Sequence, residues 1–185
     1  MLFLRHASTP GMRSACFPSD EPADAASLRQ AANAEALDSR TGEKSLWAAP
    51  ATAARQTADA LGWAAIEVPE LAEVDSGRWR GLPYTQVAQT EPAALAAWLS
   101  DPEAAPHGGE SQADLAARVA GWLDKAELVS IVICDVGVIR AALGHALGLG
   151  PLQTARFDVA PLTTTELLPA RGGWRVAHVN RKVIT

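Results

Sequence analysis

The 185-residue sequence is poor in cysteine and in positive charge, and it has no long apolar run. Its two cysteines, Cys16 and Cys134, show no metal-ligand spacing, so we expect free thiols rather than a zinc site or a disulfide framework. Lys and Arg number 16 against 21 Asp and Glu, and the net charge of -5 disfavours nucleic acid or an acidic membrane surface as a partner. No stretch approaches the roughly 20 apolar residues of a membrane span, and residues 1–4 are followed at once by charge, unlike a signal peptide. These absences favour a cytoplasmic protein.

The composition, 48% hydrophobic and 20% charged, is that of a globular chain long enough for one sizeable core. The clearest strand is Leu128–Cys134, whose uninterrupted β-branched run predicts a central position in a sheet covered on both faces. Helical spacing predicts a helix over Ala25–Leu37, with Ser27 as a residue type that caps its start. Two alternating runs around Gly172 and Gly173 predict an edge hairpin. The segment 10–22 is rich in Pro, Gly and Ser and is expected to be a loop.

The first nine residues carry the clearest chemical signal. Residues 2–4 read as a short buried strand, which stops at Arg5 and His6. Open parallel sheets bind ligands at the carboxyl ends of their strands, so this pair is placed to face a cleft. A neutral His is able to attack phosphorus while an Arg grips two phosphoryl oxygens. The alternative is an ordinary strand end with solvated polar residues.

Five blocks of the chain share one resemblance. They are Leu-Arg-His-x-x-Thr ending at Thr9, Pro50 with Ala54-x-Gln-Thr-Ala ending at Ala58, Leu-x-Glu-x-Asp-x-Gly-x-Trp-x-Gly over 71–81, Gly-Gly-Glu-Ser over 108–111, and Gly-Val-Ile-Arg over 137–140. Together they resemble the histidine phosphatase superfamily, also called phosphoglycerate mutase-like. The residue pattern of the loop after His6 resembles that of the small α-ribazole-phosphatase-like branch.

The resemblance implies a single domain over residues 1–185, with 83–110 as a lid that sets substrate choice. The implied fold is a three-layer α/β/α sandwich with a mainly parallel sheet and one antiparallel edge strand. His6 would be the nucleophile, Arg5 the phosphoryl clamp and Glu73 the proton donor to the leaving oxygen. A loop carboxylate paired with Arg78 or Arg80 is the alternative for Glu73. Family members need no metal or organic cofactor, so none is expected.

Three further residues, Thr9, Arg13 and Gly137, are candidates for contacting the substrate. His107, in the lid segment, is expected to be an exposed loop residue rather than a substrate contact.

Two departures from the family pattern fall on the phosphate pocket. The clamping Arg of the second block is Ala53 here, and the second His of the last block is Asp135. Arg55 lies about 200° further around the same helix, so we expect it on the surface. His145 lies roughly 15 Å along its helix from Asp135 and does not replace the missing His.

These substitutions predict an impaired site. Losing one electrostatic donor typically costs about 10²–10³ in rate, and the two changes together predict a loss of about 10⁴-fold or more. We expect Asp135 to pair with Arg5 or protonated His6, and Arg13 is the only cation that the sequence suggests as a replacement.

Three hypotheses remain open at this stage. One is a phosphatase of reduced activity that acts on a small phosphorylated metabolite through phospho-His6. Another is a non-catalytic relative that binds a small ligand or partner in the old cleft. A third is a divalent-metal site of His6, Glu73 and Asp135.

Overall fold

A computed structural model describes residues 1–34, 45–126 and 130–183. A six-stranded mixed sheet forms its centre, with the strand order β3-β2-β4-β1-β5-β6. The strands are β1 (Leu2–Arg5), β2 (Ser45–Ala48), β3 (Ile66–Glu67), β4 (Ser130–Cys134), β5 (Thr163–Ala170) and β6 (Gly173–Lys182). Strands β1 to β4 are parallel to one another, whereas β5 runs antiparallel to both β1 and β6. β5 is therefore the strand that runs opposite to its neighbours, and it belongs to the predicted edge hairpin.

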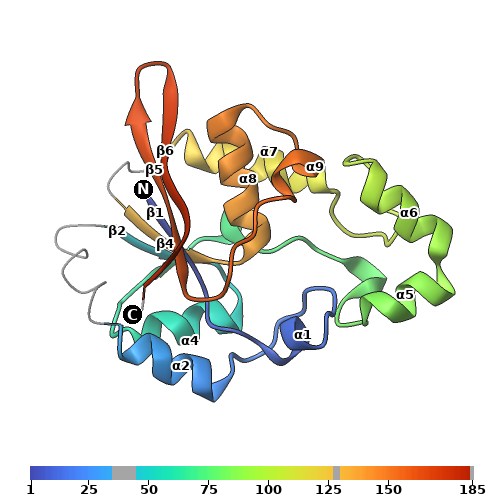
Figure 1. Ribbon diagram of the computed structural model, residues 1–185, viewed down its shortest axis with the longest axis horizontal. Helices are drawn as coiled ribbons and strands as arrows, with labels where there is room; N and C mark the ends of the chain where they lie inside the picture. Colours follow the sequence, from blue (N-terminus) through green and yellow to red (C-terminus); the bar gives the residue numbers. More distant parts are fainter. Residues whose placement is uncertain (35–44, 127–129, 184–185) are drawn as a thin grey trace.

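Helices cover both faces of this sheet, which gives the predicted three layers (Figure 1). Helices α2 and α4 lie on one side, and α7, α8 and α9 lie on the other. The described helices are α1 (Pro10–Arg13), α2 (Ala25–Ala32), α4 (Thr52–Ala60), α5 (Tyr84–Thr90), α6 (Pro92–Ser100), α7 (Gln112–Leu123), α8 (Val136–Leu147) and α9 (Pro151–Thr154). Short 3-10 turns occur at Pro69–Leu71 and Gly77–Trp79.

The sheet centre is apolar because the strands that form it are apolar on both faces. Every residue of β4 is buried, as its β-branched run predicted. Phe3 and Leu4 of β1 are fully buried beside it, and Ile139 of α8 packs in the same core. The rigid centre fixes where β1 and β4 end, and those ends carry the candidate chemistry.

Local predictions differ from the structure at two places near the N-terminus. The segment 10–22 begins with the short helix α1, because Thr9 caps it by accepting a hydrogen bond from Met12 N. Ser27 does not cap α2; Asp24 occupies the cap position, and Ser27 Oγ instead accepts from Ser8 N at 3.0 Å. The predicted extension of α2 to residue 37, and residues 128 and 129 of the predicted strand, lie partly or wholly outside the described residues.

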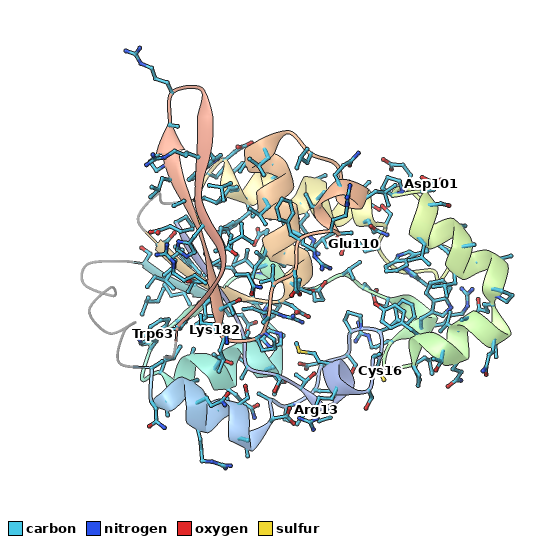
Figure 2. The ribbon with its side chains drawn as sticks, viewed as in Figure 1. Arg13, Cys16, Trp63, Asp101, Glu110 and Lys182 are labelled. Atoms are coloured by element: carbon cyan, nitrogen blue, oxygen red, sulfur yellow. The ribbon has the colours of Figure 1, made fainter. Side chains whose placement is uncertain are left out.

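Helices α5 and α6 extend away from the sheet (Figure 1) and fall within the segment predicted as a lid. Asp101 and Glu110, labelled in Figure 2, mark the loop that leads back from α6 to α7. Beneath these helices, Phe17 and Trp79 are buried in an aromatic cluster whose ring centroids lie 5.1 Å apart. The cluster joins the lid segment to the loop that follows α1.

The prediction that His107 is exposed is wrong. His107 is buried, and its ring lies 5.0 Å from that of Trp79. Its Nδ1 accepts a hydrogen bond from Gly109 N at 3.0 Å. Its place in a loop segment suggested exposure, but the rings of Trp79 and Trp98 pack against the imidazole and bury it. Burial of the ring lowers the pKa of His107.

Within the described residues, no helix combines the length and apolarity needed to cross a bilayer. Cys16 and Cys134 are both free thiols, as expected.

Candidate active site

The pairing of β1 with β4 brings the candidate catalytic residues together. Arg5 is the register partner of Cys134, and His6 N donates to the Cys134 carbonyl at 3.0 Å. His6 and Asp135 are therefore adjacent at the carboxyl edge of the parallel strands, although 129 positions separate them along the chain. The sequence predicted this edge as the functional one.

Helix α4 holds the turn that follows β1. Thr57 Oγ1 accepts a hydrogen bond from Ala7 N at 3.0 Å and donates to the Ala53 carbonyl at 2.7 Å. Gln56 Oε1 accepts from Ala23 N at 2.8 Å. The Gln-Thr pair of the second sequence block thus anchors the turn beside His6 and the loop beyond it.

The contacts of His6 fix which ring nitrogen faces the cleft. Its side chain is only 4% exposed, and Nδ1 lies 2.7 Å from the Ala7 carbonyl oxygen. A carbonyl oxygen only accepts, so Nδ1 carries the proton of this bond. Nε2 then points toward Asp135, with 3.8 Å to Oδ1. Nε2 is thus the ring nitrogen that faces the cleft and Asp135.

The Asp135 carboxylate occupies the centre of the site. Its Oδ1 lies 3.3 Å from Arg5 Nε and accepts from Val136 N at 2.6 Å, at the start of α8. Burial alone raises the pKa of the Asp135 carboxyl, but the His6 imidazole and the Arg5 charge outweigh it and leave that pKa below its ordinary value. The carboxylate is therefore ionised and paired, as the sequence predicted.

The Arg5 guanidinium is committed to partners within the chain. Besides Asp135, it donates from Nη1 to the Val159 carbonyl at 2.5 Å and from Nη2 to Met12 Sδ at 3.5 Å. No nitrogen of this guanidinium is left without a partner. An incoming anion therefore meets a guanidinium whose charge Asp135 already partly neutralises.

Glu73 lies beside Asp135, not in the surface pairs considered as its alternative. Arg78 pairs with Glu91, and Arg80 pairs with Asp75. Burial and the neighbouring Asp135 charge raise the pKa of Glu73 to about 8, so its carboxyl holds a proton at neutral pH.

Gly137 allows this arrangement of Glu73. A Cβ atom at position 137 would lie 2.1 Å from Glu73 Oε1, so the carboxyl approaches the first turn of α8 only because the residue there is glycine. The structure therefore places Gly137 against the candidate proton donor.

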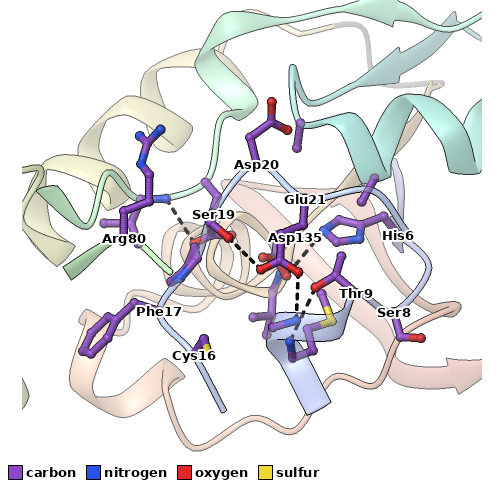
Figure 3. A pocket seen from close by; sticks show the side chains of 18 of the residues that line it. His6, Ser8, Thr9, Cys16, Phe17, Ser19, Asp20, Glu21, Arg80 and Asp135 are labelled. Atoms are coloured by element: carbon purple, nitrogen blue, oxygen red, sulfur yellow. Dashed lines mark hydrogen bonds and ion pairs between the residues drawn. The ribbon is translucent and has the colours of Figure 1, made fainter. Parts of the chain in front are cut away.

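These residues open into a cleft of about 670 Å³ (Figure 3). Thr9 and Arg13 line it, as does Ala53, whose small buried side chain leaves no cation at the position of the family Arg. Arg13 is 63% exposed and forms an ion pair with Asp24.

The sequence suggested Arg13 alone as a replacement cation, but the structure places a second cation at the cleft. Arg80, labelled in Figure 3, also lines the cleft from the loop after Gly77–Trp79. Tyr84 lines it as well, and burial together with the charges of Glu73 and Asp135 raises the pKa of its hydroxyl. Sequence reasoning missed both as cleft residues; the one signal for Tyr84 was that the chain has a single tyrosine.

Two other basic residues lie where the sequence placed them. Arg55 is exposed and paired with Glu67, and His145 pairs with Asp124 at 2.8 Å. Among the residues that the structure describes, no group of three or more His, Cys, Asp or Glu side chains is placed to hold a metal ion. The geometry therefore does not favour the metal hypothesis for His6, Glu73 and Asp135.

Known proteins resemble this chain along most of its length. A Mycobacterium tuberculosis protein named as a bifunctional protein is 33% identical over 137 residues, which is 70% of this chain and 36% of that protein. The match thus covers about a third of the length of such curated relatives. A glucosyl-3-phosphoglycerate phosphatase of M. tuberculosis is 48% identical over 48 residues, or 26% of this chain and 22% of that protein.

Solved structures agree with the observed topology. A mycobacterial glucosyl-3-phosphoglycerate phosphatase in complex with VO3 superposes with a TM-score of 0.83 at 27% identity, covering 98% of each chain. A putative α-ribazole-5'-P phosphatase from Escherichia coli superposes with a TM-score of 0.86 at 19% identity, covering 100% of this chain and 97% of that one, and shows the shared fold. The family model described as the histidine phosphatase superfamily (branch 1) matches residues 1–182. This protein therefore belongs to the histidine phosphatase superfamily, as its sequence motifs predicted.

Proposed function

We propose that this chain binds a small phosphorylated metabolite in the His6 cleft and hydrolyses its monoester slowly through a phospho-His6 intermediate. The observation that carries the proposal is the Nδ1 contact of His6 with the Ala7 carbonyl, which leaves Nε2 as the attacking nitrogen at the cleft wall. Arg5 and Glu73 stand beside it as the clamp and the acid.

The reaction then follows in two steps. Nε2 of His6 attacks phosphorus, and the bond from phosphorus to the leaving oxygen breaks. Glu73 gives its proton to that oxygen, which a pKa of about 8 permits at neutral pH. Water next attacks the phosphorus of phospho-His6, and the bond from phosphorus to Nε2 breaks. Glu73 recovers a proton from that water, and inorganic phosphate leaves.

Slow turnover follows from Asp135 and Ala53. The Asp135 carboxylate holds Arg5 and faces His6, so it occupies the place where donors would otherwise meet phosphoryl oxygens. Ala53 offers no second guanidinium. Each lost donor costs about 10²–10³ in rate when it is a well-placed electrostatic group.

Phosphoryl-like anions in a relative support the choice of substrate class. Solved structures of a mycobacterial glucosyl-3-phosphoglycerate phosphatase contain VO3 in one case and inorganic phosphate in another, each at 27% identity to this chain. The relative also carries a phosphatase name, which makes monoester hydrolysis the first activity to test.

The test uses p-nitrophenyl phosphate with the full chain. We expect slow turnover, a phosphohistidine at His6 detectable by mass spectrometry under non-acidic conditions, and loss of both in His6→Ala. The exposed variant Arg55→Ala is the matched control and keeps both signals. Turnover that persists in His6→Ala would contradict the proposed mechanism.

The second candidate is a non-catalytic relative that binds a ligand in the same cleft. The observation that favours it is the ion pair of Arg5 with Asp135, alongside hydrogen bonds from Arg5 to the Val159 carbonyl and to Met12 Sδ. Absence of both turnover and phosphohistidine, with binding of a phosphorylated ligand retained, would select this candidate.

A further inference from the structure

A second cavity of about 740 Å³ adjoins the His6 cleft, within the size range of about 300–1,000 Å³ that is usual for small-molecule sites. The two cavities share part of their walls, formed by Glu73, Tyr84 and Asp135 among others. The second extends from this common wall between α7, α8 and α9 and reaches the end of α6. A ligand at His6 thus has a neighbouring space that the phosphoryl chemistry does not use.

The cavity exists because two helices present small residues to it. Ala113, Ala116 and Ala120 line it from α7 at spacings of one helical turn, and Gly137, Ala141 and Gly144 line it from α8 in the same way. Residues three and four apart share a helix face, so each helix offers a continuous strip with little side-chain volume.

Exposed leucines gather at this cavity. The large hydrophobic residues found exposed in the described chain are Ile66, Leu99, Leu147, Leu149 and Leu152, and three of these five line this cavity. Exposed apolar surface gathered at one place on a soluble chain marks a ligand or partner site.

Two of the basic side chains in the cavity wall already bond within the chain. Arg140 donates from Nε and Nη2 to the Phe157 carbonyl at 3.1 Å and 2.8 Å. His145 is paired with Asp124. Most of the other lining residues are apolar, so a strongly hydrated sugar or nucleotide would lose water there and find few matching hydrogen bonds.

We propose that the substrate is amphipathic: a phosphate monoester of a largely hydrocarbon alcohol, with its phosphoryl group at His6 and its hydrocarbon part in the second cavity. This rests on the proposed function for the phosphoryl end. The shared wall at Glu73 and Asp135 places the ester oxygen between the two cavities, beside the candidate acid. The hydrocarbon contacts also supply binding free energy that the weakened phosphate pocket lacks.

The test is isothermal titration of the full chain with non-hydrolysable alkylphosphonates, from ethyl to decyl, below their micelle concentrations. We expect the Kd to fall about fourfold for each added methylene until the cavity is filled. Ala116→Trp, which fills the cavity, and Leu152→Glu, which charges its exposed mouth, should flatten this dependence without changing the affinity for inorganic phosphate. Ile66→Glu, the same apolar-to-charged change at an exposed residue outside the cavity, is the control and keeps the wild-type slope.

The outcomes separate this inference from the proposed function. If ethylphosphonate and phosphate bind but the Kd is independent of chain length, the amphipathic substrate is wrong and the proposed function stands. If decanol binds as tightly as decylphosphonate and phosphate does not bind at all, the cavity is a separate apolar site and both proposals fail. If light scattering shows a dimer that Leu152→Glu dissociates, with no chain-length effect, the leucines form an interface between copies and the inference is likewise overturned.

Discussion

Replacing Asp135 with Asn tests the electrostatic reasoning most directly. The change keeps the shape of the side chain and an oxygen able to accept from Val136 N, but it removes the charge that lies 3.3 Å from Arg5 Nε and 3.8 Å from His6 Nε2. An anion that reaches both groups must come within about 4 Å of this carboxylate. We expect Asp135→Asn to bind phosphate and vanadate more tightly than the wild type.

The magnitude follows from Coulomb's law. Two unit charges about 4 Å apart interact by about 1 kcal/mol in water and about 4 kcal/mol at an effective dielectric constant of 20. The Asp135 side chain is 15% exposed, which places the site between these limits. Since 1.4 kcal/mol is a factor of ten, the Kd for a singly charged anion should fall by about 5-fold to about 10³-fold.

The assay is calorimetric titration with phosphate at pH 6, where wild-type Glu73, with a pKa of about 8, is protonated. Burial, the larger cause of that raised pKa, is unchanged in Asp135→Asn. Asp59→Asn removes an equal charge from an exposed position outside the cleft and should leave the Kd unchanged. A folded Asp135→Asn variant that binds phosphate no more tightly than the wild type would refute the view that Asp135 blocks the anion site.

Other predictions follow from the same geometry. Folding raises the pKa of Glu73 from 4.5 to about 8, so the folded state binds this proton more tightly than the unfolded state does. The unfolding free energy should therefore fall as pH rises from about 4.5 to about 8. Glu73→Gln should remove this fall, as measured by urea denaturation across that range. The double variant Ala53→Arg with Asp135→His restores both missing donors and should raise p-nitrophenyl phosphate turnover by about 10²-fold or more; no gain in a folded double variant would contradict the assignment of these two positions. Gly109→Ala should destabilise the chain by about 1–3 kcal/mol, because its Cβ would lie 2.0 Å from the Asp75 carbonyl oxygen, whereas Gly121→Ala, with open space around it, should be neutral or stabilising in the same thermal melts.

Much of the fold was readable from local patterns. The β-branched run ending at Cys134 predicted the central strand, and the alternation around Gly172 and Gly173 predicted the hairpin of β5 and β6. Such patterns depend on neighbours within one element, so a single sequence contains them. The short helix α1 and the cap of α2 were missed, because the hydrogen-bond partners of Thr9 and Ser27 depend on the surrounding fold.

The residues of the candidate site were likewise only partly predictable from the sequence. The motifs identified His6, Arg5 and Glu73 and exposed the substitutions at Ala53 and Asp135. They did not reveal that Arg80 and Tyr84 line the cleft, because a side chain's route into a cavity depends on the packing of segments far apart in sequence.

The sequence by itself determined the family, the strand that ends at the candidate site, and the residue types available there. Only the tertiary structure decided their states: which nitrogen of His6 is free, that Glu73 keeps its proton, and that small residues on α7 and α8 leave an apolar cavity beside them. The physical reason is that residue identity and periodicity are local properties, whereas burial, charge pairing and empty volume arise only when distant segments pack against one another.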